Sequence, residues 1–156
     1  MLFYYAQPTP SLLIVRLNQH ERVSLTISGV ICDSMCKRYK IAYVLGVHFK
    51  SGEWGEHRCG SVITTTFEGR SRYCVVNHFL RITDKDFASV TWLSTPVYPY
   101  WPITLVARVR ELGVNRQHEL PAVLPLASIE PTPILVERDG TDYYMMRVKG
   151  YDRVGT

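Results

Sequence analysis

The sequence predicts an all-β protein: residues 1–156 form a single domain, an antiparallel sandwich or a jelly-roll-like barrel of about eight to ten strands with at most one short helix. Strand-like runs follow one another closely between residues 22 and 82. Apolar residues almost never recur at helical spacing over a stretch long enough to compete. Tyrosine occurs 10 times, and aromatic residues favour strands.

Apolar patterning predicts the first strands. Leu12–Leu17 is a short apolar run, and Val23, Leu25 and Ile27 alternate with serine and threonine. Alternation of this kind is typical of a strand with one buried face and one solvent-exposed face. Ile41–Phe49 is apolar on both sides, so it is predicted to be one central strand, covered above and below.

A meander is predicted next. Arg58–Phe67 and Tyr73–Ile82 are rich in β-branched and aromatic residues, and they flank the turn residues Glu68-Gly69. The predicted register places Phe67 opposite Arg72.

The middle of the chain is less regular. Thr83 and Asp86 have capping-box spacing, which predicts a short helix running to about Leu93. Ile103–Arg110 alternates again and is predicted to be a strand. Prolines interrupt residues 113–133, so this segment is predicted to be an extended connection with room for one edge strand, because proline cannot donate to an interior ladder.

The strongest local signal lies near the C-terminus. Ile134–Arg138 and Thr141–Lys149 flank the dipeptide Asp139-Gly140. Asp-Gly supplies the two positive-φ positions of a type I′ turn, whose twist matches that of the strands it joins. We therefore expect a terminal β-hairpin.

Net charge and the absence of targeting motifs say little about partners. The formal charge is +4, which is compatible with an acidic partner but does not select one. The N-terminus meets Pro8 and Pro10 without a preceding basic region, so no secretory signal is predicted. The longest apolar stretch is shorter than the roughly 20 residues that cross a bilayer. We expect a soluble protein, cytoplasmic or part of a virion, with reduced cysteines.

A zinc site is the first chemical candidate, because thiolate and imidazole are the ligands that tetrahedral zinc prefers. The register predicted across the first hairpin makes Cys59 and His78 diagonal neighbours, roughly 7–8 Å apart. A site would have to join Cys59, together with His57 or His78, to Cys32 or Cys36. The same register would also allow His78 to activate Cys59 as a catalytic nucleophile. The sequence places no acid beside this pair to orient the histidine, so a catalytic pair is not predicted.

Strand geometry argues against the metal. Cys74 and His78 stand four residues apart on one predicted strand, which is about 13 Å at roughly 3.3 Å per residue, so they cannot share an ion. The favoured interpretation is small buried cysteines and a hydrogen-bonded core histidine, with no cofactor.

Aromatic loops are the predicted protein-binding sites. Residues 96–102 interleave Tyr98, Tyr100 and Trp101 with three prolines, which hold the chain extended and leave little entropy to lose on binding. The alternative is a loop that packs its rings against its own domain. Trp54 is a second candidate, at the tip of a predicted turn between two acids.

These observations predict a non-enzymatic structural or interaction protein that assembles with copies of itself or binds a protein partner, such as a virion or appendage component. No short catalytic motif occurs in the chain. The first alternative is a nucleic-acid-binding β module in which the same aromatic residues stack on bases, and the second is a zinc-binding protein. The basic surface of a nucleic-acid module would consist of Lys37, Arg38, Lys40, Arg70 and Arg72.

Overall fold

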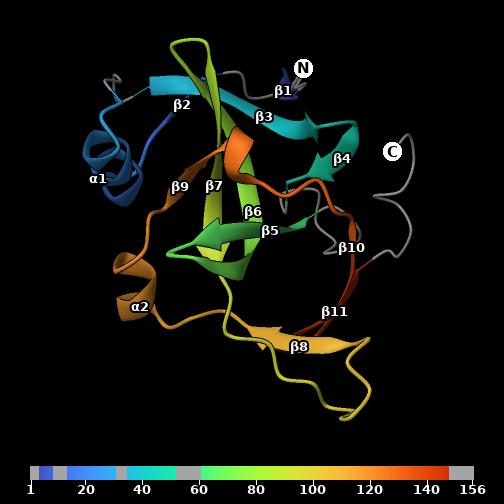
Figure 1. Ribbon diagram of the computed structural model, residues 1–156. Coiled ribbons are helices and arrows are strands. Elements are labelled where there is room, and N and C mark those ends of the chain that lie inside the picture. The colour runs from blue at the N-terminus through green and yellow to red at the C-terminus, as the bar shows by residue number, and fades with distance from the viewer. Residues whose placement is uncertain (1–3, 9–13, 31–34, 52–60, 148–156) are drawn as a thin grey trace.

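The protein is mostly β, as predicted. The computed structural model describes residues 4–8, 14–30, 35–51 and 61–147, and Figure 1 shows that they form a large curled sheet and a smaller second sheet. No helix among these residues is long and apolar enough to cross a membrane. The described elements are β1 (Tyr4–Pro8), β2 (Ile14–Arg16), α1 (Gln19–Ile27), β3 (Met35–Val44), β4 (Val47–Lys50), β5 (Val62–Phe67), β6 (Arg70–Ile82), β7 (Lys85–Trp92), β8 (Ala107–Arg110), α2 (Val114–His118), β9 (Val123–Pro125), the 3-10 helix η2 (Leu126–Ser128), β10 (Ile134–Asp139) and β11 (Asp142–Arg147).

Strand β6 is the central strand of the large sheet. It is 13 residues long and pairs with β7 along one edge. Along its other edge it pairs with β5 near its start and with β3 near its end. β3 also pairs with β1, β2 and β4, and β9 pairs with β7 at the opposite edge of the sheet. The smaller sheet has the order β10-β11-β8, and all pairings are antiparallel.

Tight turns close three of the hairpins. Both turn residues have positive φ, between 48° and 82°, which is the type I′ geometry that matches strand twist. The turns are Leu45-Gly46, Glu68-Gly69 and Thr83-Asp84.

Two sequence predictions are wrong at these turns. Residues 41–49 form the β3–β4 hairpin rather than one central strand. Thr83 begins a turn into β7 and not a helix. The reason is tertiary: β7 is paired on both edges, by β6 and β9, and residues 87–90 are buried on both faces, which overrides the local capping signal.

The strand predicted from Val23, Leu25 and Ile27 is also wrong, because residues 19–27 form helix α1. Asn18 caps the helix, and Glu21 completes a reciprocal capping box with it. The buried residues of α1 are Glu21, Ser24 and Leu25, at helical spacing, while Ile27 is 81% exposed. Six residues of alternation were too few to distinguish the two periods.

Two predicted hairpins are present with a shifted turn or register. Phe67 pairs with Arg70, not with Arg72, because the two-residue turn closes as tightly as possible. In the terminal hairpin Asp139 pairs with Asp142, so the turn residues are Gly140 and Thr141. Gly140 has φ 61° and Thr141 does not have positive φ, which is the type II′ pattern instead of type I′.

The remaining predicted segments are shorter or more structured than expected. Leu12–Leu17 contains β2, and Ile103–Arg110 contributes only its last four residues, as β8. The proline-rich segment 113–133 contains α2, the edge strand β9 and η2. β9 ends on Pro125 and pairs with β7 alone among the described strands, as expected of an edge position.

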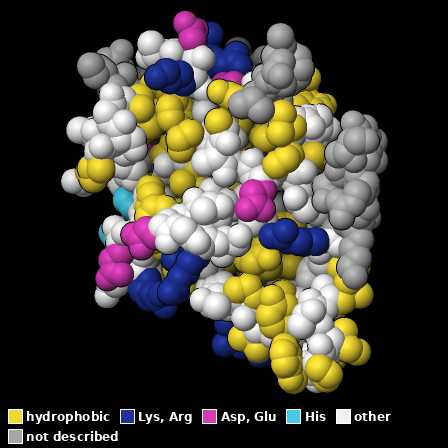
Figure 2. All heavy atoms as spheres, in the orientation of Figure 1, with side chains coloured by type: hydrophobic (Ala, Val, Ile, Leu, Met, Phe, Trp, Pro, Cys, Tyr) yellow, Lys and Arg dark blue, Asp and Glu magenta, His cyan; other side chains and the backbone are white. Residues whose placement is uncertain are grey.

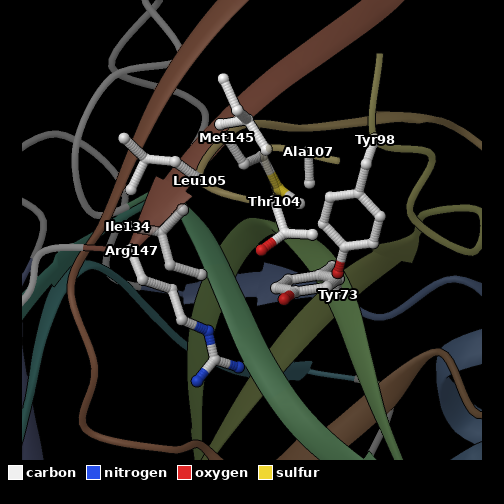
Figure 3. A pocket seen from close by; sticks show the side chains of 9 residues that line it. Tyr73, Tyr98, Thr104, Leu105, Ala107, Ile134, Met145 and Arg147 are labelled. Carbon is white, nitrogen blue, oxygen red and sulfur yellow. The ribbon is translucent and has the colours of Figure 1, made fainter. Parts of the chain in front are cut away.

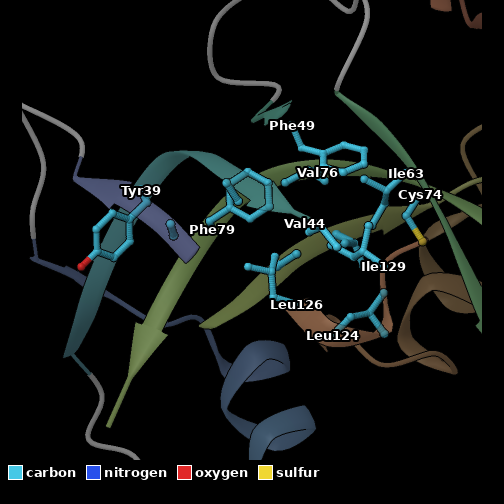
Figure 4. Close-up of a cluster of buried hydrophobic side chains, with 14 of the residues drawn as sticks. Tyr39, Val44, Phe49, Ile63, Cys74, Val76, Phe79, Leu124, Leu126 and Ile129 are labelled. Carbon is cyan, nitrogen blue, oxygen red and sulfur yellow. The ribbon is translucent and has the colours of Figure 1, made fainter. Parts of the chain in front are cut away.

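Apolar side chains gather in three buried clusters. The largest fills the concave side of the curled sheet and includes Phe49, Phe79 and Trp92 (Figure 4). A second lies between the two sheets, around Tyr143 and Ile134. The third holds α1 against the end of β6 through side chains such as that of Leu25.

Candidate functional site

The loop between β7 and β8, residues 94–106, is the most unusual surface of the described structure. We call it the aromatic loop. Figure 1 shows it projecting below the smaller sheet, and Figure 2 shows apolar side chains gathered at that end of the molecule. Six of its large apolar side chains are between 38% and 73% exposed: Val97, Tyr98, Tyr100, Trp101, Ile103 and Leu105. The alternative that the loop packs its rings inward is therefore wrong for Tyr100 and Trp101.

Backbone hydrogen bonds brace this loop. Val97 and Arg108 exchange two bonds of 2.9 and 2.7 Å at its base. At its tip the Trp101 amide donates to the Tyr98 carbonyl at 3.2 Å, and the Ile103 amide donates to the Tyr100 carbonyl at 2.8 Å. The rings are therefore displayed on a shaped segment, which lowers the entropy lost on binding.

The aromatic loop carries no charge. Its sequence, STPVYPYWPITLV, contains no aspartate, glutamate, lysine, arginine or histidine. It therefore offers nothing to attract a phosphate backbone or to repel an identical loop.

A cavity of about 400 Å³ opens beside the base of the loop (Figure 3). Elements far apart in the sequence build it. Loop residues form one wall, and side chains of β6, β8, β10 and β11 form the rest. The lining residues are Tyr73, Tyr98, Ile103, Thr104, Leu105, Ala107, Ile134, Met145 and Arg147.

Arg147 brings a positive charge to the rim of this cavity. Its Nη2 atom lies 3.7 Å from Oε2 of Glu130, which is an ion pair but longer than a hydrogen bond. Its Cζ atom lies 6.0 Å from the ring centroid of Tyr73. The Arg147 guanidinium is thus held loosely. Among the described residues, Glu130 is its ion-pair partner.

Of the candidates for zinc, the structure describes Cys36 and His78, which it places on different strands. Cys32, His57 and Cys59 lie outside the described residues. Cys36 is buried in the cluster around α1, and within the described ranges no three histidine, cysteine or acidic side chains form a metal-binding group.

A β-bulge in β6 separates Cys74 from His78. The register shifts between Val76 and His78, so Cys74, Val76 and Phe79 share the face of the main cluster, and His78 points to the opposite face, toward α1. Burial raises the pKa of the Cys74 thiol far above its ordinary value, although Arg72 nearby acts in the other direction. Cys74 is a buried apolar residue rather than a ligand.

His78 instead meets Glu21, a buried acid that sequence reasoning missed. His78 Nε2 donates to Glu21 Oε2 at 3.1 Å, the backbone N–H of Asn18 donates to Oε1 at 2.9 Å, and the Ser89 hydroxyl is a further donor. Burial by itself raises the pKa of Glu21, but these hydrogen bonds outweigh it and hold the pKa below 4.5. The available sequence signal was the capping-box spacing of Asn18 and Glu21.

The five predicted basic residues do not form one surface. Lys37 pairs with Arg81 near the end of β6, with Arg38 beside it, whereas Arg72 lies near the strand's start. Nine residues separate Arg72 from Arg81, which is about 30 Å at roughly 3.3 Å per residue. Arg72 is also engaged, with Cζ 5.4 Å from the Trp92 ring centroid.

The remaining predicted residues stand as follows. Trp54 lies outside the described residues. Lys40 is half-buried on β3, and Arg70 is exposed beside the β5–β6 turn. Sequence reasoning named three of the six exposed loop residues as binding residues. It did not name Val97, and it missed Ile103 and Leu105 because they belonged to a predicted strand.

Comparison with protein-family models, with curated proteins and with solved structures returned no match.

Proposed function

We propose that this is a non-enzymatic structural or interaction protein that assembles with copies of itself through the aromatic loop. One observation carries the proposal: a braced, uncharged loop holds six large apolar side chains in solvent. Exposure of this extent on one loop costs free energy unless another surface covers it.

The exposed area supports an interface. Aromatic side chains offer about 150–250 Å² each, so the three partly exposed rings present roughly 340 Å². With the three smaller aliphatic side chains, the patch is on the order of 500 Å². The largest apolar patch of a typical monomer is roughly 300–600 Å², whereas a stable interface takes about 800 Å² from each partner. The patch on this one loop is thus at the upper end of what a whole monomer exposes, a size that often marks a binding surface.

Charge favours a second copy over nucleic acid. Two copies of a chain with charge +4 repel weakly at long range, but the uncharged loops meet without a like-charge penalty. A nucleic-acid surface needs several cations beside its stacking rings. The predicted basic residues are divided between the two ends of β6, and Arg147, which lines the cavity beside the loop, is paired with Glu130.

The test is the solution mass by light scattering, at about 50 and 200 mM salt, with and without single-stranded DNA. We expect a dimer or larger assembly whose mass does not respond to salt or DNA. Trp101→Ala should weaken assembly by about 30-fold or more, as expected for loss of a central aromatic anchor. Val114→Ala is the matched control, because Val114 is also 73% exposed but lies on α2.

Two results would contradict the proposal. One is a strict monomer at high protein concentration. The other is a complex with DNA that weakens steeply as salt rises, which would favour the nucleic-acid alternative.

A further inference from the structure

The chemistry of the cavity beside the loop favours an aromatic guest. Two of its walls are the rings of Tyr73 and Tyr98, and the Met145 sulfur is directed inward between them and Leu105 (Figure 3). Aromatic rings stack on other rings, thioethers make favourable contacts with ring edges, and a guanidinium is attracted to a ring face. Arg147, at the rim, supplies the last of these.

The size of the cavity is suited to one side chain. At about 400 Å³ it lies at the small end of the range, roughly 300–1,000 Å³, of pockets that enclose whole small ligands. Ala107 and Ile134 provide apolar lining, and the Thr104 hydroxyl supplies a polar group for an indole N–H.

The loop itself carries the most suitable guest. Trp101 is 73% exposed, more than Tyr98 or Tyr100, and it stands at the tip of the segment whose base forms one wall of the cavity. Tryptophan is also the aromatic side chain that attracts a guanidinium most strongly. In its own chain the ring stays in solvent and leaves the cavity open.

We infer that Trp101 of one copy occupies this cavity in a second copy. The inference rests on the proposed self-assembly and specifies its geometry. The projecting ring and the receiving cavity lie on one end of the molecule, so a two-fold axis between two copies makes both insertions at once. Such a closed dimer buries two patches of roughly 500 Å², and the sum reaches the roughly 1,000 Å² expected of a specific interface.

The decisive experiment removes the ring from one copy and blocks the cavity in another. Trp101→Ala keeps the cavity but has no ring to insert. Thr104→Phe keeps the ring and fills the cavity from an exposed loop position, and Thr104→Ser leaves the cavity open as its control. Each variant alone should dimerise at least tenfold more weakly than the parent chain, and the serine control should match the parent.

Mixing the two weakened variants tests the insertion directly. A heterodimer of Trp101→Ala with Thr104→Phe regains one of the two insertions, whereas each homodimer has none. We therefore expect the mixture to form heterodimers at least tenfold more tightly than either variant forms homodimers, as measured by native mass spectrometry. Retained near-ultraviolet circular dichroism and melting temperature establish that both variants fold.

A second measurement does not depend on blocking the cavity. N-acetyltryptophanamide added to the Trp101→Ala variant should shift the nuclear magnetic resonance signal of the Met145 methyl group. The same compound added to Val114→Ala, whose cavity already holds Trp101 of a second copy, should leave that signal unchanged. Assembly that is lost with Trp101→Ala but unaffected by Thr104→Phe, with no heterodimer preference, would overturn the insertion and leave the loop as the interface. A parent chain that stays monomeric would overturn both.

Discussion

Replacing Glu21 with alanine should destabilise the protein strongly, because this carboxylate joins α1 to the sheet. Glu21 is 3% exposed and accepts hydrogen bonds from the backbone N–H of Asn18, the His78 ring and the Ser89 hydroxyl. Alanine would leave these donors without their acceptor. Each orphaned buried donor costs about 1–3 kcal/mol.

Three orphaned donors, of which His78 is partly exposed, should lower the free energy of unfolding by about 3–5 kcal/mol in Glu21→Ala, a large part of the roughly 5–15 kcal/mol of a typical domain. Glu21→Gln keeps one acceptor oxygen and should cost less. Urea unfolding measures both. Glu137→Gln, on the exposed face of β10, is the control and should change the stability by less than about 0.5 kcal/mol.

Acid provides an independent check of the same reasoning. The pKa of Glu21 is lowered from 4.5 in the folded protein, so its ionised form stabilises the fold fully above about pH 4.5. That contribution is lost as the pH falls through the lowered pKa of the folded state. The stability difference between the parent chain and Glu21→Gln should therefore shrink as the pH falls from about 5 through the lowered pKa of the folded state. A difference that stays constant over this range, or a cost of less than about 1 kcal/mol for Glu21→Ala, would refute the assignment.

Three further outcomes follow from named contacts. Replacing Thr83-Asp84 by Asn-Gly should raise the free energy of unfolding by about 1 kcal/mol, because φ values of 48° and 64° strain a β-branched residue most; an unchanged urea midpoint would contradict this. Gln117→Ala should lower it by about 2–3 kcal/mol, since the side-chain amide bonds the backbone N–H and C=O of buried Trp92 at 2.8 and 2.7 Å. Cys74 should resist alkylation at pH 8 until the protein unfolds, because burial raises its pKa; mass spectrometry of labelled peptides would show rapid labelling of the folded chain if this is wrong.

Hairpins between neighbouring strands were predictable because their signals are local. Glycine at a turn position and apolar alternation on both sides placed β5–β6 and β10–β11 close to their observed positions. The type I′ turns at Leu45-Gly46 and Thr83-Asp84 were missed, because leucine and threonine rarely take positive φ. Pairing with the rest of the sheet supplies the energy that holds them there.

Helix α1 shows where local patterns reach their limit. Val23, Leu25 and Ile27 fit a strand, and the same residues fit a nine-residue helix once Glu21 has a partner. That partner, His78, lies 57 residues away and is turned toward α1 by the bulge in β6. A pairing of this separation leaves no trace in a short stretch of sequence.

By itself the sequence determined the β-rich class, the β5–β6 and β10–β11 hairpins and the aromatic loop, since these follow from backbone preferences that act over a few residues. Tertiary structure alone decided which side chains share a face. It placed Trp101 in solvent and built a cavity from Tyr73, Ala107, Ile134 and Met145, which lie on four different strands. The physical reason is that burial depends on which distant strands pair and in which register, and a shift of one residue turns a side chain to the other face of a sheet.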